Sequence, residues 1–265
     1  MPLVALALIL IQEMSARLGV VSGKGLAALI RESWGVRATA IILSVLVLAN
    51  LANTVSEFAG VAASMEIFGV SKYVSVPLAA VLVWVLIVRG NYRIVERVFL
   101  VASAIYLSYV ASGLLARPLW QDVGRAMIYP QLRFEAGYLT LAITVIGTTI
   151  APWMQFYQQS AIVDKGLKAG DLGYERLDVI VGSVFAIIVA AFISISCAAT
   201  LHVRGITVET AKEAALGLGP LAGRHATTLF AIGLLNASLF SAAILPLSTA
   251  YLVCEAFGWE SGVNH

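Results

Sequence analysis

Long apolar runs separated by polar connections dominate this chain. Seven such segments can be placed, and they cover roughly residues 1–18, 38–68, 73–90, 97–116, 137–163, 179–202 and 226–256. The longer connections are 19–37, 117–136, 164–178 and 203–225. About 20 apolar residues span a bilayer as a helix, and a lipid-buried chain must satisfy its backbone polar groups internally. The pattern therefore predicts an all-α polytopic membrane protein, built as one transmembrane domain over residues 1–265 with about seven transmembrane helices.

Composition supports this class and excludes others. The 265 residues are 60% hydrophobic and only 12% charged, which is typical of a multi-pass integral protein of a cell or inner membrane. A net charge of +2 without a basic cluster argues against a nucleic-acid partner, so the expected partners are the lipid bilayer and a small solute. Cys197 and Cys254 lie in apolar stretches without metal-type spacing and are interpreted as packing residues. No enzyme motif or cofactor-binding motif is present.

The fifth apolar segment contains a helix breaker at membrane depth. Its sequence from Ile146 to Gln155 reads Ile-Gly-Thr-Thr-Ile-Ala-Pro-Trp-Met-Gln. Because Pro152 has no N–H, the carbonyl of Thr148, four residues earlier, loses its helical partner. An orphan carbonyl is costly in hydrocarbon unless protein, water or an ion satisfies it. Broken helices at this depth are typical of transporter ion sites.

Other polar residues mark a possible ion path. Glu57 lies mid-segment, with Asn50, Asn53 or Thr54, Gly60 and Ser64 at helical spacing on one face. An ionisable group at that depth favours an ion or proton path, although a structural carboxylate bonded to a neighbouring helix would give the same pattern.

Glutamines follow the break at helical spacing. Gln155, Gln158 and Gln159 form a stripe that either lines an aqueous vestibule or hydrogen-bonds a neighbouring helix. The last segment has a polar middle at Asn236, Ser238 and Ser241, and Pro246 predicts a kink there.

Three local patterns resemble one transporter family. The stretch 12–27, beginning Gln-Glu-Met-Ser-Ala-Arg-Leu-Gly, is similar to the end of the second helix of the NRAMP divalent-metal transporters. Residues 54–60, Thr-Val-Ser-Glu-Phe-Ala-Gly, resemble the family's third-helix motif, whose glutamate aligns with Glu57. Residues 151–154, Ala-Pro-Trp-Met, fall where typical members have Met-Pro-His-Asn. This resemblance spans essentially the whole chain, from the family's second helix to its eighth.

The resemblance implies a partial LeuT-like fold of inverted repeats, in which two broken helices hold the metal between them. By that alignment the chain lacks the family's first helix, with its Asp-Pro-Gly-Asn ligands, and the helices after the eighth. We therefore expect a fragment of a longer gene product that contains one wall of the metal site. An Asp-Pro-Gly run encoded shortly upstream of Met1 would support this expectation.

The departures from the family motif bear on which ion is carried. The resemblance assigns the metal wall to the Thr148 carbonyl, Ala151 and Trp153, with Glu57, Thr54 and Gln158 on the ion or proton path. Four-residue spacing from Ala151 adds Gln155 to the same wall. Alanine replaces the family's methionine at 151, tryptophan replaces histidine at 153, and Gln158 and Thr54 replace a histidine and an aspartate. Loss of the thioether favours hard, hydrated Mg²⁺ over softer metals. None of the other replacements titrates near neutral pH, which leaves Glu57 as the remaining candidate proton carrier.

These changes resemble the NRAMP-related magnesium transporters. The leading hypothesis is uncoupled alternating-access transport of Mg²⁺, with Mn²⁺ as a second substrate. The alternatives are a proton-coupled Mn²⁺/Fe²⁺ transporter with an atypical site, an amino-acid permease of the same fold, and a fragment that does not transport.

Overall fold

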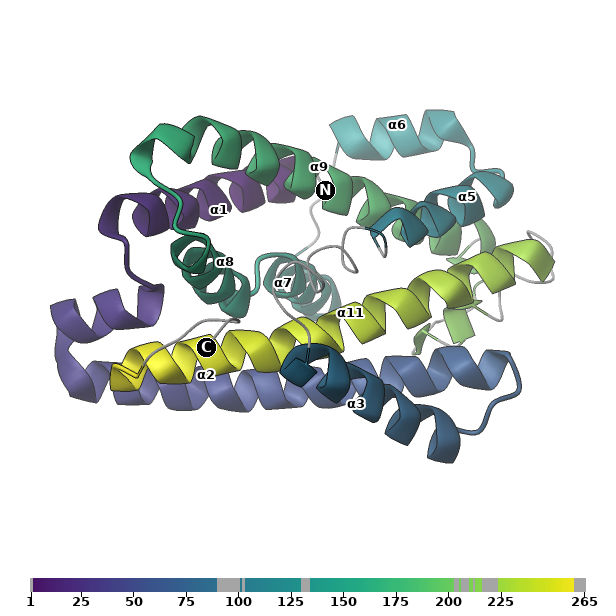
Figure 1. Cartoon of the computed structure of the whole chain (residues 1–265). Coiled ribbons are helices and arrows are strands. Elements are labelled where there is room, and N and C mark those ends of the chain that lie inside the picture. Colours follow the sequence, from purple (N-terminus) through teal and green to yellow (C-terminus); the bar gives the residue numbers. More distant parts are fainter. Residues whose placement is uncertain are drawn as a thin grey trace. The chain divides into compact units, whose positions relative to one another are not determined.

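The computed structural model describes residues 2–89, 101, 103–129, 134–202, 205, 210–211, 213–215 and 224–259. Every regular element among these residues is helical (Figure 1). The elements are α1 (Pro2–Ser22), α2 (Leu26–Ile67), α3 (Lys72–Arg89), α5 (Leu107–Leu115), α6 (Trp120–Ile128), α7 (Ala136–Thr149), α8 (Pro152–Asp164), a 3-10 turn η1 (Ala169–Asp171), α9 (Leu172–Thr200) and α11 (Arg224–Phe257).

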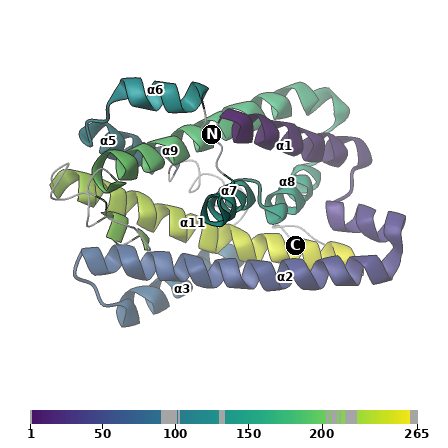
Figure 2. The ribbon, with the colours of Figure 1, turned by 180° about the vertical axis from the view of Figure 1, so that it is seen from behind.

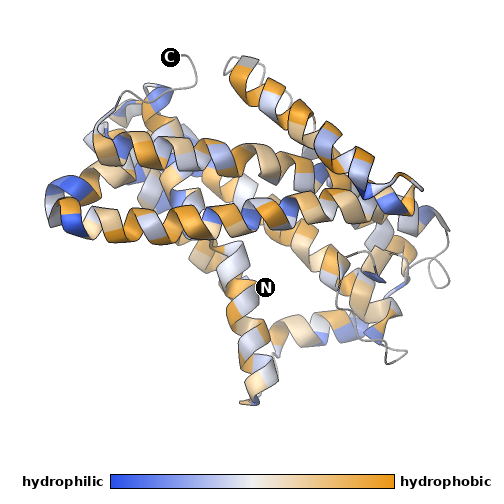
Figure 3. Cartoon of the chain, turned by 90° about the horizontal axis from the view of Figure 1, so that it is seen from below, coloured by the Kyte–Doolittle hydropathy of each residue, from blue (hydrophilic) through white to orange (hydrophobic). Residues whose placement is uncertain are grey.

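Five helical stretches are long and apolar enough to cross a membrane: Pro2–Ser22, Leu26–Ile67, Ala136–Asp164, Ala169–Thr200 and His225–Phe257. Two shorter apolar helices, Lys72–Val88 and Ser103–Leu115, fall in the remaining predicted segments. Apolar residues run along the long helices in Figure 3. The all-α membrane fold is thus confirmed, while seven full crossings remain a prediction. The start of the predicted segment 97–116 lies outside the described residues, apart from Val101.

Helical structure extends into stretches that the sequence predicted as connections. The predicted connection 19–37 is mostly helical, because α1 continues to Ser22 and α2 already begins at Leu26. An interruption occurs at Gly35, whose φ of 80° and ψ of 173° fall outside the helical region. Glycine has no Cβ and adopts such a positive φ readily, so α2 consists of two helices that meet at a kink at Gly35. In the same way, α6 and the first turns of α9 occupy parts of the predicted connections 117–136 and 164–178.

The chain forms two compact units. Unit 1 comprises Met1–Ala52, Tyr129–Phe185 and Leu245–His265, and unit 2 comprises Asn53–Ile128 and Ala186–Ile244. Three of the four boundaries fall within α2, α9 and α11, and the fourth follows the end of α6.

In unit 1, α1 lies beside α8, as both ribbon views show (Figures 1 and 2). Gly19 permits this approach, because a Cβ there would lie only 3.2 Å from Gln159 Cγ and Ile162 Cγ2. Among the described residues of unit 1, two buried clusters lie in the core. One contains Ala16, Val20, Ile162 and Val179, and the other contains Ala27, Leu46, Phe156 and Leu252.

Unit 2 packs around Val83, Ala242 and Ala243, with Phe58, Ile87 and Leu239 against them. Aromatic side chains extend this packing. The rings of Tyr109 and Phe230 meet edge to face at 5.1 Å, and those of Tyr106 and Phe240 meet at 6.3 Å. Such edge-to-face pairs add to the stabilisation that their burial provides.

Candidate cation site

The predicted break separates α7 from α8. The last backbone hydrogen bond of α7 runs from the Ile150 N–H to the Ile146 carbonyl at 2.9 Å. Ala151 is extended, with φ −75° and ψ 136°, and Pro152 begins α8. Proline suits the first helical turn because its missing N–H would have no helical partner there. The sequence from Gly147 to Pro152 therefore produces two half-helices, which Figure 2 shows as separate ribbons.

The Thr148 carbonyl lies in the last turn of α7, where Pro152 offers it no N–H. The side chain of Thr148 does not compete for this carbonyl, because its hydroxyl donates backwards to the Thr144 carbonyl at 2.9 Å. The hydroxyls of Thr144 and Thr140 donate the same backward bond one and two turns earlier, respectively. At the end of α7 the structure thus provides a carbonyl oxygen and a hydroxyl oxygen with acceptor capacity.

On the α8 side of the break, Ala151 is buried and Trp153 is half-buried. The Trp153 carbonyl accepts a hydrogen bond of 3.1 Å from Ser248 Oγ of α11. The Gln155 carbonyl accepts one of 2.9 Å from Ser15 Oγ of α1. Two neighbouring helices therefore fix the first turn of α8.

The Gln155 side chain is unusual. Its Oε1 and Nε2 are both buried, and neither has a hydrogen-bond partner among the residues that the structure describes. Gln158 Oε1 is in the same condition within the described chain. Buried polar atoms are almost always paired, so such atoms in a native protein indicate a water, an ion or a functional site. Both glutamines lie in unit 1, with the break.

Glu57 and Thr54 belong to unit 2. The Ser238 and Ser241 hydroxyls of α11 hydrogen-bond to the half-buried Glu57 carboxyl. Gly60, one turn further on, allows α11 to approach, because a Cβ there would overlap Ser238 Oγ. These bonds are what the structural interpretation of Glu57 requires, and its role on an ion path stays a prediction. Thr54 is half-buried on the same helix.

Sequence reasoning missed several contacts. Ser238 and Ser241 were recognised as polar but were not assigned to Glu57. Ser15 and Glu255, which both hydrogen-bond to residues of α8, were not predicted as site residues. In the structure a glycine faces each polar group, Gly60 opposite Ser238 and Gly25 opposite Glu255, but no sequence pattern links either pair.

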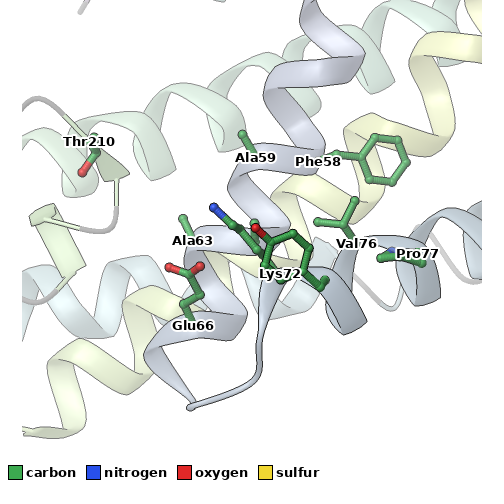
Figure 4. A pocket seen from close by; sticks show the side chains of 10 residues that line it. Phe58, Ala59, Ala63, Glu66, Lys72, Val76, Pro77 and Thr210 are labelled. Atoms are coloured by element: carbon green, nitrogen blue, oxygen red, sulfur yellow. The ribbon is translucent and has the colours of Figure 1, made fainter.

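A cavity of about 630 Å³ lies in unit 2, where α2 ends and α3 begins (Figure 4). Its walls are mainly apolar, with Phe58, Val76 and Pro77 among them, and Glu66 and Lys72 supply its charges. It contains none of the predicted site residues.

No group of three or more His, Cys, Asp or Glu side chains that could hold a metal ion occurs in the described part of the chain. Any cation bound at the break would therefore meet backbone carbonyl, hydroxyl and amide oxygens on this wall. These are hard ligands of the kind that Mg²⁺ and Ca²⁺ accept.

The fold and the break together define a multi-pass helical membrane protein with a discontinuous helix. The family profile described as "Natural resistance-associated macrophage protein-like" (Nramp) matches residues 1–265, and the chain belongs to this family. The family has a LeuT-like fold and consists of transporters, not enzymes.

Several relatives carry the name divalent metal cation transporter MntH. The protein of Brucella suis is 31% identical over 264 residues, which are 94% of this chain and 57% of that protein. The protein of Erwinia tasmaniensis is 29% identical over 243 residues, or 88% of this chain and 58% of its own length. The protein of Clostridium acetobutylicum is 30% identical over 146 residues. The chain thus spans less than two thirds of the length of each of these relatives.

Proposed function

We propose that the protein transports divalent metal cations, with Mg²⁺ as the principal substrate and Mn²⁺ as a second one, by uncoupled alternating access. The break between α7 and α8 is the observation that carries this proposal. It combines a carbonyl at Thr148 without its helical partner and a small residue at Ala151. It also brings the buried Gln155 amide, which has no partner among the described residues, to the first turn of α8.

The preference for Mg²⁺ follows from ligand chemistry. Ala151 provides no thioether where typical members of the family have methionine, and soft sulfur ligands favour transition metals. Mg²⁺ dehydrates reluctantly and usually keeps several waters, which amide and carbonyl oxygens can hydrogen-bond. The Thr148 carbonyl and the Gln155 amide could therefore hold the water shell of the ion as well as the ion itself.

Uncoupled transport follows from the residues at the family's proton-carrying positions. Trp153, Gln158 and Thr54 do not titrate near neutral pH. Glu57 is the remaining candidate, and the Ser238 and Ser241 hydroxyls hydrogen-bond to its carboxyl. A carboxyl engaged in this way suits a structural role.

One alternative keeps the same class of substrate. A proton-coupled Mn²⁺ or Fe²⁺ transporter would use Glu57 as its proton carrier, and the name of the MntH relatives gives this alternative some weight. An amino-acid permease of the same fold has less support, because binding a carboxylate would require free N–H groups at the break, and Pro152 removes one of them.

Ion flux separates these functions. The purified protein in proteoliposomes should take up Mg²⁺ down its gradient, reported by an internal Mg²⁺ indicator, without acidification of the lumen. Ala151→Met should shift the preference toward Mn²⁺ and Cd²⁺, whereas Ala80→Met, at an exposed position on α3, should not. Strict Mn²⁺ selectivity with acidification would favour the proton-coupled alternative, and unchanged selectivity in Ala151→Met would remove sulfur loss as the cause.

A further inference from the structure

A buried carboxyl group connects the second half of α8 with α11 and α2. Glu255 of α11 is 8% exposed, and its Oε1 accepts a hydrogen bond of 2.5 Å from Ser160 Oγ of α8. The Ala27 backbone N–H at the start of α2 also interacts with this carboxyl, whose Oε2 is buried without a hydrogen-bond partner among the described residues. Glu255 thus joins three helices within unit 1.

The turn between α1 and α2 is held by the same group of residues. A Cβ on Gly25 would overlap the Glu255 carboxyl, so only glycine permits the present approach. From the other side, Gln159 Nε2 donates a hydrogen bond of 2.8 Å to the Lys24 carbonyl, and the Gln159 side chain is fully buried. Glu255, Ser160, Gln159 and the turn Lys24–Gly25 form what we name the α8 clamp.

A further contact lies one turn along. The Tyr251 hydroxyl of α11 donates a hydrogen bond of 2.9 Å to Asp164 Oδ2 at the end of α8. The rings of Tyr157 and Tyr251 meet edge to face, with their centroids 6.2 Å apart. In contrast, α7 contains no buried residue. The contacts of α8 with α1, α11 and the turn, not those of α7, therefore fix where α8 lies.

We propose that Glu255 is a positioning residue for the candidate cation site at the break between α7 and α8. It holds α8, and with it Ala151 and Gln155, in the geometry that binds the ion. This inference deepens the proposed transport function and rests on it for its purpose. Without the carboxyl, the Ser160 hydroxyl and the Ala27 N–H lose a buried partner, which loosens α8. The predicted consequence is weaker cation binding, seen as a higher KM, with a smaller effect on the maximal rate.

Three variants and one control test the clamp. Glu255→Leu removes the carboxyl, Gly25→Ala displaces it sterically, and Glu255→Gln keeps an acceptor for both donors. Gly173→Ala is the matched control, since a Cβ there would meet nothing within 4 Å. The first two should raise the KM for Mg²⁺ roughly three- to tenfold, less than the hundredfold that a displacement of about 1 Å can cost. Glu255→Gln and Gly173→Ala should stay near the wild-type KM.

A second readout does not depend on transport. In a Cys197→Ala background, the half-buried Cys254 beside Glu255 reports local opening through its rate of maleimide labelling. Glu255→Leu and Gly25→Ala should label Cys254 several times faster than Gly173→Ala. Slower transport at unchanged KM and unchanged labelling would overturn the positioning role. Faster labelling without Mg²⁺ or Mn²⁺ flux in any variant, wild type included, would support the clamp and contradict the proposed function.

Discussion

Substituting Gly60 tests whether α11 supports Glu57 through close packing. A Cβ at residue 60 would overlap Ser238 Oγ and would lie 3.2 Å from Ser238 Cβ, so the serine hydroxyl must turn away from Glu57. Overpacking costs about 1–3 kcal/mol, and a lost hydrogen bond to a charged group costs about 1.5–3 kcal/mol. Alanine regains about 1 kcal/mol of helix propensity. We expect Gly60→Ala to lose about 1.5–5 kcal/mol of unfolding free energy.

The same change behaves differently once the serine hydroxyl is removed. In a Ser238→Ala background the added Cβ would lie 3.2 Å from the Cβ of residue 238 and 4.0 Å from Leu234 Cδ1. Gly60→Ala should then cost much less, with a coupling energy of about 1.5–5 kcal/mol. Unfolding in mixed dodecylmaltoside–SDS micelles measures these free energies. Gly182→Ala is the control, because a Cβ there would meet nothing within 4 Å and should be neutral or slightly stabilising. An equal loss in both backgrounds would refute the packing argument.

Three further predictions concern the break. Pro152→Ala restores an N–H that can bond to the Thr148 carbonyl, so it should raise the KM for Mg²⁺ in proteoliposome flux, while an unchanged KM would show that this carbonyl does not bind the ion. Gln155→Leu should raise the same KM, and Gln121→Ala on the exposed face of α6 should not; equal effects would exclude a specific role for the amide. Ser15→Ala removes the hydroxyl that donates a hydrogen bond to the Gln155 carbonyl, so it should cost about 0.5–1.5 kcal/mol of unfolding free energy. Stability equal to that of the wild type would show that this hydrogen bond contributes nothing.

The helical membrane fold and the break could be predicted from sequence because each depends on local chemistry. Apolar length predicts a span, and Pro152 lacks an N–H whatever surrounds it. The short first helix of α2, before Gly35, was missed, because it lies in a polar stretch that looks like a loop. The partners of Glu57 and Glu255 lie about 100 or more residues away in the chain, so no local pattern could connect them. Gly60 and Gly25 face these contacts in the structure, but a glycine in a sequence does not indicate which distant residue it faces.

Mg²⁺ flux with simultaneous lumenal pH recording tests the central claim most directly. The account predicts that the protein in proteoliposomes carries Mg²⁺ down its gradient at constant lumenal pH, and that Pro152→Ala and Gln155→Leu each raise the KM. Mn²⁺ uptake that excludes Mg²⁺ and acidifies the lumen, with a KM unaltered by either substitution, would contradict it.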